Sequence, residues 1–183
     1  MKTDKIILGI DPGTSIMGYG IIHIQNKKII LIKMDVLNLT NVKTHENKLK
    51  KIFETTLELI DLYKPDEFAV EAPFFGKNVQ SMLKLGRAQG VSMAASLYKN
   101  IPIFEYSPKK IKMSITGNGN ASKEQVAGML KSLLGISEIP NQLDATDGLA
   151  AAVCHFFQKD SLANKKDYSG WDAFVKNNPK RIS

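Results

Sequence analysis

The sequence predicts a single α/β domain built around a central strand that is covered on both faces. Residues Ile6 to Ile10 are all apolar or glycine and do not alternate with polar residues, which is typical of a strand buried on both sides. Three strand-like segments come first, and helix-like and strand-like segments then alternate along the chain. A chain of 183 residues with 43% hydrophobic content is sufficient for one compact core.

The first three strands are expected to be antiparallel neighbours. Asp11 ends the central strand, and Pro12 and Gly13 then break it. Gly20 to Ile24 follows closely enough to return beside the first strand, and Ile29 to Val36 forms the third strand. Asp11 therefore lies at a strand's carboxyl end, where open α/β sheets place their ligands. Taken alone, an Asp-Pro-Gly sequence is more simply explained by an aspartate that caps a turn.

A helix and a second buried strand follow. Residues 44–63 repeat their apolar positions at spacings of three and four, which predicts an amphipathic helix. Glu67 to Glu71 is short, apolar in its middle and flanked by proline, which predicts a strand that runs parallel to the first after a crossover. Glu71 then repeats the position of Asp11, as an acid at the carboxyl end of a strand.

The helix predicted over residues 78–99 contains two interior glycines, Gly86 and Gly90. Each interior glycine costs ~1 kcal/mol of helix stability relative to alanine. We therefore expect another backbone to approach this helix closely, either from the sheet or from a second subunit.

Capping residues and composition predict the remaining elements. Ile101 to Tyr106 reads as a fifth strand, and the Ser-Pro pair at 107–108 begins a short basic helix. The glycine-rich loop over 117–120 could approach a phosphate, although most such loops are only turns. Ser122 and Gln125 form a capping box that begins the next helix. An alanine-rich, largely buried helix is predicted over residues 140–157.

Composition indicates a soluble protein with a polyanionic partner. The formal net charge is +7, which suits nucleic acids, ribosomal contacts or anionic membranes without choosing among them. Cys154 is the single cysteine and excludes an intrachain disulfide, and no segment approaches ~20 consecutive apolar residues. We expect a cytoplasmic protein with no membrane span, a folded domain over 1–157 and a polar, basic tail over 158–183.

Four acids form the candidate chemical site. Asp144 and Asp147 are three apart near the start of the last helix and so share a face. As a pair they could simply be solvated acids at a helix N-terminus. Together with Asp11 and Glu71 they offer only oxygen ligands, which favours magnesium or manganese over zinc. Two such ions ~3.5–4 Å apart activate water against a phosphodiester, so this set predicts nuclease chemistry.

The motifs that carry these acids resemble the RuvC-type Holliday-junction resolvases of the ribonuclease-H-like superfamily. The resemblance covers roughly Ile6 to His155 and rests on five segments in family order: ILGIDPGTSIMGYG, PDEFAVEAPFFGKN, LKLGRAQGV, PIFEYSPKKIK and LDATDGLAAAVCH. It implies a ribonuclease-H-like mixed five-stranded sheet, with the first three strands antiparallel and helices on both faces. It also implies a two-ion Mg²⁺ site, with Mn²⁺ as a substitute, whose ligands are Asp11, Glu71, Asp144 and Asp147.

The resemblance further implies a partner and a set of DNA contacts. Members of this family act in recombination and repair as homodimers that nick two strands of like polarity at four-way DNA junctions, together with the branch-migration proteins RuvA and RuvB. The LKLGRAQGV helix resembles the element that forms the dimer. Phe74 matches an aromatic residue that stacks on unpaired bases, Lys112 and Lys123 match lysines near the scissile phosphate, and Lys77 lies on a loop that approaches DNA.

Three other functions fit parts of the pattern. Asp11, Gly13 and Thr14 match the phosphate-binding hairpin of actin-like and sugar-kinase ATPases, but those proteins need two such lobes and this chain supplies one. A non-catalytic DNA-binding module would have no need of four acids. A ribonuclease-H-like enzyme that acts on RNA differs only in its substrate.

Overall fold

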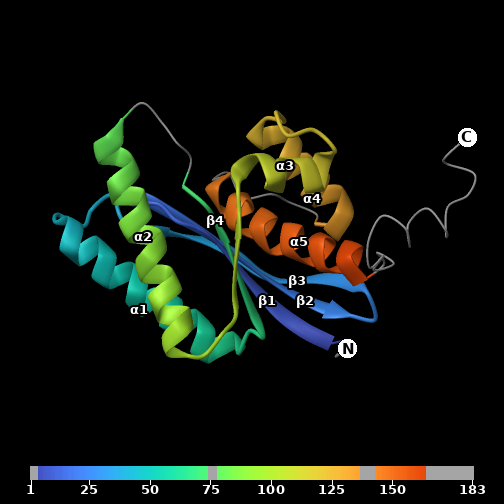
Figure 1. Ribbon diagram of the computed structural model, residues 1–183, viewed down its shortest axis with the longest axis horizontal. Coiled ribbons are helices and arrows are strands. Elements are labelled where there is room, and N and C mark those ends of the chain that lie inside the picture. Colours follow the sequence, from blue (N-terminus) through green and yellow to red (C-terminus); the bar gives the residue numbers. More distant parts are fainter. Residues whose placement is uncertain (1–3, 74–77, 137–142, 164–183) are drawn as a thin grey trace, which may run out of the picture.

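The computed structural model describes residues 4–73, 78–136 and 143–163 and forms three layers, with one mixed sheet between two layers of helices (Figure 1). The sheet has five strands in the order β3-β2-β1-β4-β5. Strands β1, β2 and β3 are antiparallel, whereas β4 runs parallel to β1 and β5 parallel to β4. The strands are β1 (Asp4–Asp11), β2 (Ile16–Gln25), β3 (Lys28–Asn38), β4 (Glu67–Glu71) and β5 (Ile103–Tyr106).

The helices divide between the two faces of the sheet (Figure 1). Two of them, α1 and α2, pack together on one face, and α3, α4 and α5 cover the other. The helices are α1 (His45–Tyr63), α2 (Val79–Tyr98), α3 (Pro108–Thr116), α4 (Lys123–Leu134) and α5 (Asp144–Ala163). This architecture confirms the predicted α/β class, the antiparallel first three strands and the parallel fourth strand.

Element ends agree with the predicted caps. Ser107 caps α3 with proline at its first position, and Ser122 and Gln125 form both bonds of the capping box of α4. The last helix begins at Asp144 and continues to Ala163, beyond the boundary that we placed at residue 157. The division into a domain and a tail stays a prediction, because residues 164–183 lie outside the described part of the chain.

Alternation along β1 sends its side chains to two separate cores. Ile7 packs toward α5, whereas Leu8 and Ile10 pack toward α1 and α2. Strand β4 follows the same rule, with Ala69 facing α5 and Phe68 on the opposite side. Both faces of the central strands are therefore buried, as the non-alternating sequence predicted.

Glycines let α5 lie directly on the sheet. A Cβ atom built on Gly18 would lie 1.8 Å from the backbone oxygen of Asp144, and one on Gly20 would lie 2.4 Å from the Cα of Leu149. In the reverse direction, a Cβ on Gly148 would lie 2.5 Å from the Cα of Tyr19. No side chain fits in these contacts, so glycine sets the depth at which the acidic end of α5 meets the sheet.

The glycines of α2 behave differently. A Cβ on Gly86 or Gly90 would meet no atom within 4 Å, so neither residue packs closely on the sheet. Helix α2 instead buries Ala88, Ser92 and Ala95. Of the two explanations that the sequence left open, close packing on the sheet is wrong, because these glycines lie on the outward side of the helix.

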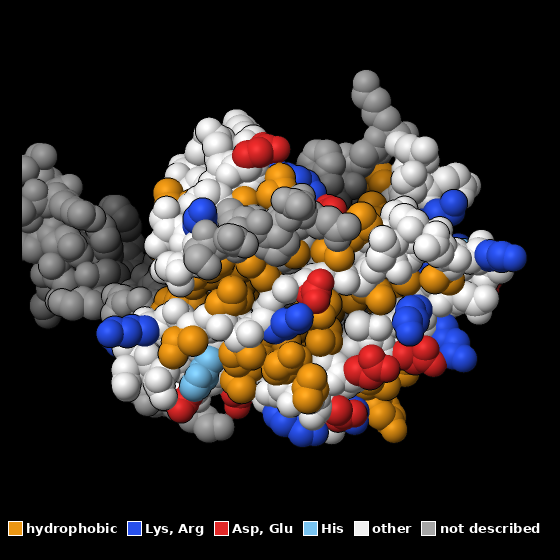
Figure 2. Space-filling model, turned by 180° about the vertical axis from the view of Figure 1, so that it is seen from behind, with side chains coloured by type: hydrophobic (Ala, Val, Ile, Leu, Met, Phe, Trp, Pro, Cys, Tyr) orange, Lys and Arg blue, Asp and Glu red, His pale blue; other side chains and the backbone are white. Residues whose placement is uncertain are grey.

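Strand β3 forms an edge of the sheet and mixes apolar with charged side chains. Ile30 and Ile32 are 44% and 40% exposed, while Lys33 and Asp35 form an ion pair with an Nζ–Oδ2 distance of 3.0 Å. Seen from behind, hydrophobic and charged side chains share the surface of the molecule (Figure 2). Charges on an edge strand discourage pairing with the edge of another sheet.

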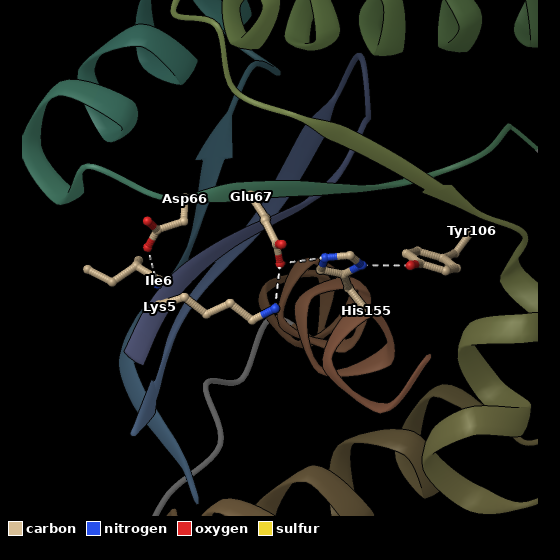
Figure 3. Close-up of polar contacts among 6 residues, drawn as sticks. All are labelled: Lys5, Ile6, Asp66, Glu67, Tyr106 and His155. Carbon is tan, nitrogen blue, oxygen red and sulfur yellow. Dashed lines mark hydrogen bonds and ion pairs between the residues drawn. The ribbon is translucent and has the colours of Figure 1, made fainter. Parts of the chain in front are cut away.

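A buried polar network fastens α5 to β4 and β5 (Figure 3). His155, fully buried on α5, places its Nε2 2.8 Å from a carboxylate oxygen of Glu67 and its Nδ1 2.6 Å from the hydroxyl of Tyr106. Lys5 also donates to Glu67 at 2.8 Å, and the ring of Phe104 stacks on His155 with centroids 4.2 Å apart. Because Glu67 and Glu71 share a strand, this network fixes α5 along the strand that carries Glu71.

We expect His155→Leu to lower the free energy of unfolding by about 2–4 kcal/mol, since a buried carboxylate and a hydroxyl each lose a partner. Tyr106→Phe, which removes only the hydroxyl, should cost about 1 kcal/mol. Urea unfolding followed by circular dichroism measures both. Equal midpoints for His155→Leu and wild type would show that the network does not stabilise the fold.

None of the helices in the described ranges is long and apolar enough to cross a membrane.

Candidate active site

Asp11 and Glu71 lie side by side at the carboxyl ends of neighbouring parallel strands. The β1–β4 ladder pairs Ile10 with Val70, and Asp11 and Glu71 are the next residues on the two strands. Gly9 and Ala69, two residues earlier, face α5, so alternation turns both acids toward α5 as well. The predicted equivalence of these two positions is confirmed.

The first turn of α5 brings Asp144 and Asp147 to the same place. Lys123, the first residue of α4, lies 3.1 Å from Asp144 Oδ1 and 2.5 Å from Asp147 Oδ2 through its Nζ. Since one ammonium group reaches both carboxylates, the two acids share a helix face as predicted. The side chain of Asp147 is only 15% exposed and that of Asp144 37%, so Asp147 is not a freely solvated acid.

A cleft of about 450 Å³ opens over these groups. Asp11, Glu71 and Asp147 line it from the sheet side and α5, while Lys112 and Lys123 line it from α3 and α4. Sequence reasoning did not single out Lys109 as a site residue, and for the glycine-rich loop it left open both a simple turn and an approach to a phosphate. The remaining lining residues are Pro108, Lys109, Ile111, Gly119, Asn120, Val126 and Ala150.

A smaller hollow of about 140 Å³ continues the cleft on the side of α2. Asp11 and Glu71 line both cavities, and the other residues that line the smaller one are Pro12, Ala72, Pro73 and Leu85. The two acids therefore stand between two openings, with space for a ligand on each side.

Burial and mutual repulsion raise the pKa values of these acids. Desolvation is the largest cause for Asp11, followed by the charge of Asp147, and its pKa rises to about 7. Desolvation and then the charges of Asp11 and Asp147 raise the pKa of Glu71 to about 8. Burial likewise raises the pKa of Asp147, against the opposing hydrogen bond from Lys123. Burial and mutual repulsion therefore disfavour the fully ionised form of these three acids in the metal-free protein.

Comparison with known proteins identifies the family. The family of the crossover junction endodeoxyribonuclease RuvC matches residues 7–155, which includes all four acids.

The chain belongs to the RuvC family.

Relatives and solved structures agree with this membership. The RuvC of Christiangramia forsetii is 66% identical over 100% of this chain and 95% of its own length, and that of Cytophaga hutchinsonii is 59% identical over 98% and 88%. Thermus thermophilus RuvC in complex with a Holliday junction substrate superposes with a TM-score of 0.79 at 29% identity, covering 86% of this chain and 96% of that one. The predicted ribonuclease-H-like resolvase fold is thereby confirmed.

The donor set of this RuvC-family site suits a hard divalent cation. Three of the four carboxylates, Asp11, Glu71 and Asp147, have raised pKa values, and a cation bound beside them would offset the cost of ionising them. In the part of the chain described here, however, no three His, Cys, Asp or Glu side chains are grouped as a ready metal site. The ammonium of Lys123 lies between Asp144 and Asp147, so the carboxylates are arranged around a lysine.

Two predicted DNA contacts lie outside the described residues, namely Phe74 and Lys77. The other two, Lys112 and Lys123, both line the cleft described above. Without the resemblance these lysines would be interpreted as solvated surface charges, because nothing local in their sequence distinguishes them.

The raised pKa values predict how the stability of the metal-free protein depends on pH. The folded state holds protons on Asp11 and Glu71 up to about pH 7 and 8, whereas their ordinary values are 3.8 and 4.5. The folded state therefore binds more protons between roughly pH 4 and 8, and its stability falls as pH rises through this window. Wild type should lose stability over this window, and Asp11→Asn should lose less. We therefore expect the unfolding free energy of Asp11→Asn, relative to that of wild type, to rise by roughly 1–3 kcal/mol between pH 5 and pH 8.

Urea unfolding in EDTA at several pH values measures this difference. A difference between Asp11→Asn and wild type that stays constant from pH 5 to 8 would contradict the proposed electrostatics.

Proposed function

We propose that this chain resolves Holliday junctions as a divalent-metal-dependent endonuclease that nicks two strands of like polarity. The observation that carries the proposal is the meeting of acids from two strand ends and one helix: Asp11, Glu71 and Asp147 line one cleft beside two lysines, and Lys123 joins Asp147 to Asp144. RuvC-family membership supports the nuclease activity, and the junction complex of the T. thermophilus relative supports the substrate.

Asp11, Glu71, Asp144 and Asp147 are the residues that we propose hold the metal, with Mg²⁺ as the physiological ion and Mn²⁺ as its substitute. Two bound ions would supply Lewis-acid activation of a water and stabilise the leaving oxygen. The chain's own groups prepare the site for this chemistry: β1 and β4 hold Asp11 and Glu71 rigidly, and the lysines of α3 and α4 attract the phosphate.

The positive rim of the cleft suits a DNA backbone. Lys109, Lys112 and Lys123 all line the cleft, and the whole chain carries a formal charge of +7. We assign Lys112 and Lys123 to the phosphate near the cut, Lys77 to the backbone further along, and Phe74 to stacking on unpaired bases. The last two assignments rest on the family resemblance alone.

A homodimer through α2 would place two such sites on one junction. Helix α2 exposes Val79, Leu83 and Leu97 at 64%, 51% and 62%, on the side where Gly86 and Gly90 leave open space. These positions recur at helical spacing and form one apolar face that a second copy can cover closely. In such a dimer the backbone of the second copy would approach Gly86 and Gly90 closely, which the sheet does not do.

We expect Leu83→Asp to raise the dimer dissociation constant at least roughly 100-fold, because it buries an unpaired charge at the centre of this face. Leu133→Asp is the matched control, since Leu133 on α4 is similarly exposed at 45% but lies away from α2. Analytical ultracentrifugation gives both constants. A Leu83→Asp variant that still sediments as wild type would exclude α2 as the interface.

The setting in the cell follows from the same proposal. We propose action in recombination and DNA repair in the cytoplasm, with RuvA and RuvB as branch-migration partners. Cys154, free and buried, suits a reducing compartment. Family membership decides against the ATP-binding interpretation of Asp11, Gly13 and Thr14.

Cleavage of three substrates tests the proposal. A synthetic four-way junction, a plain duplex of the same sequence and an RNA–DNA hybrid are incubated with the full chain, with Mg²⁺ or with EDTA. We expect symmetric nicks in the four-way junction when Mg²⁺ is present and no cleavage of the junction in EDTA. Preferred cleavage of the hybrid would instead support an enzyme that acts on RNA.

A further inference from the structure

We propose that Lys123 is a built-in placeholder for the metal, whose ammonium group holds Asp144 and Asp147 together until a divalent cation displaces it. This inference rests on the proposed metal site and adds a competition between the protein's own cation and the metal. Its consequence is that Lys123 weakens metal binding in the absence of DNA.

The contacts of Lys123 carry the first step. Its Nζ lies 3.1 Å from Asp144 Oδ1 and 2.5 Å from Asp147 Oδ2, so it takes up one oxygen of each acid. Among the described residues no three His, Cys, Asp or Glu side chains are grouped closely enough to hold an ion. A divalent cation that used both acids would compete with the ammonium for these two oxygens, and the two positive charges would repel each other at such short range.

The surroundings of Lys123 allow it to leave. Its backbone is fixed, because Ser122 and Gln125 close the N-terminus of α4 with a capping box. Its side chain is 51% exposed, so water screens its ion pairs and solvates it after release. Four methylene groups then let the ammonium move within the same cleft, where a DNA phosphate would be its next partner.

The charge of the site explains why a placeholder is needed. Asp147 and Asp144 hold the proton on Lys123 and raise its pKa, although burial alone would lower it. The helix dipole disfavours a cation at the first position of α4, so local helix stability does not account for this residue. A cation at this position instead offsets the repulsion among the acids of the metal-free protein.

Lys112 provides the matched comparison. It lines the same cleft and its charge acts on Glu71 and Asp147, yet in the described structure its side chain makes no hydrogen bond or ion pair with them. Removing its charge therefore changes the electrostatic potential without freeing a carboxylate oxygen. The gain in metal affinity on removing Lys123, minus the gain on removing Lys112, therefore measures the placeholder effect apart from the effect of charge.

Isothermal titration of Mg²⁺ and of Mn²⁺ into the full, DNA-free chain tests the inference. We expect Lys123→Met to bind the metal roughly tenfold more tightly than wild type, and Lys112→Met only about two- to threefold more tightly. Lys123→Arg keeps the charge and should bind as weakly as wild type. Thermal melting adds a second readout: without metal Lys123→Met should melt below wild type, and saturating Mg²⁺ should raise its melting temperature by more.

Two further variants separate this inference from the proposed function. If Asp11→Asn and Asp147→Asn lose metal binding while Lys123→Met binds no more tightly than wild type, the placeholder role is overturned and the metal site stands. If both Asn variants bind metal as wild type does, the proposed site itself is overturned. An equal gain for Lys112→Met and Lys123→Met would also overturn the placeholder, since charge alone would then explain it.

Discussion

Asp11→Asn is expected to bind four-way junctions with wild-type affinity and to cut them at least roughly 1,000-fold more slowly, because a neutral amide cannot supply the charge that holds a catalytic cation. Asp11 lines both cavities of the site from the end of β1, beside Glu71, so its carboxylate is the acid that both cavities share with Glu71. Gel-shift measurements in Ca²⁺ or EDTA give binding, and single-turnover cleavage in Mg²⁺ gives the rate.

Asp35→Asn is the control for this experiment. Asp35 is an exposed acid on the edge strand β3, where it pairs with Lys33 away from the cleft. Its replacement should leave both binding and cleavage unchanged. Junction resolution by Asp11→Asn at the wild-type rate would show that the four acids are not the catalytic site.

Gly18→Ala should damage both the fold and the activity. Its Cβ would lie 1.8 Å from the backbone oxygen of Asp144, and backbone on both sides prevents a small adjustment. We expect a loss of about 3–5 kcal/mol in unfolding free energy, or failure to fold, together with loss of cleavage as the acidic end of α5 is pushed away from Asp11. Urea unfolding and junction cleavage measure the two effects.

Gly128→Ala distinguishes this effect from any general effect of removing a glycine. Gly128 lies inside α4, and an added Cβ there would meet no atom within 4 Å. The substitution should therefore stabilise the protein by about 0.5–1 kcal/mol through helix propensity. Equal stabilities for Gly18→Ala and wild type would mean that α5 does not need this close contact.

Some parts of the fold could be predicted because their causes are local. The unbroken apolar run before Asp11 indicated a strand buried on both faces, and the pattern of Glu67 to Glu71 indicated a parallel neighbour. The capping residues Ser107 and Ser122 fixed where α3 and α4 begin. Periodicity and caps act over a few residues, so they can be seen without the tertiary structure.

Other features were missed because they depend on contacts between distant segments. Nothing in the local pattern pairs Lys123 with Asp144 and Asp147, which lie on another helix, or brings Lys109 to the cleft. Gly86 and Gly90 indicated a close approach, but only the structure excluded the sheet as the approaching element.

The sequence by itself was enough to predict the candidate site: an aspartate at one strand end, a glutamate at the next, and two acids one helical turn apart. It could predict these because each acid stands at a position that local pattern specifies. Only the tertiary structure decided how the acids meet. The glycines beneath α5 set its depth on the sheet, the His155 network fixes it along β4, and α4 delivers a lysine between two of the acids. Those three relations join residues far apart in the chain, so packing and charge in three dimensions are their physical cause.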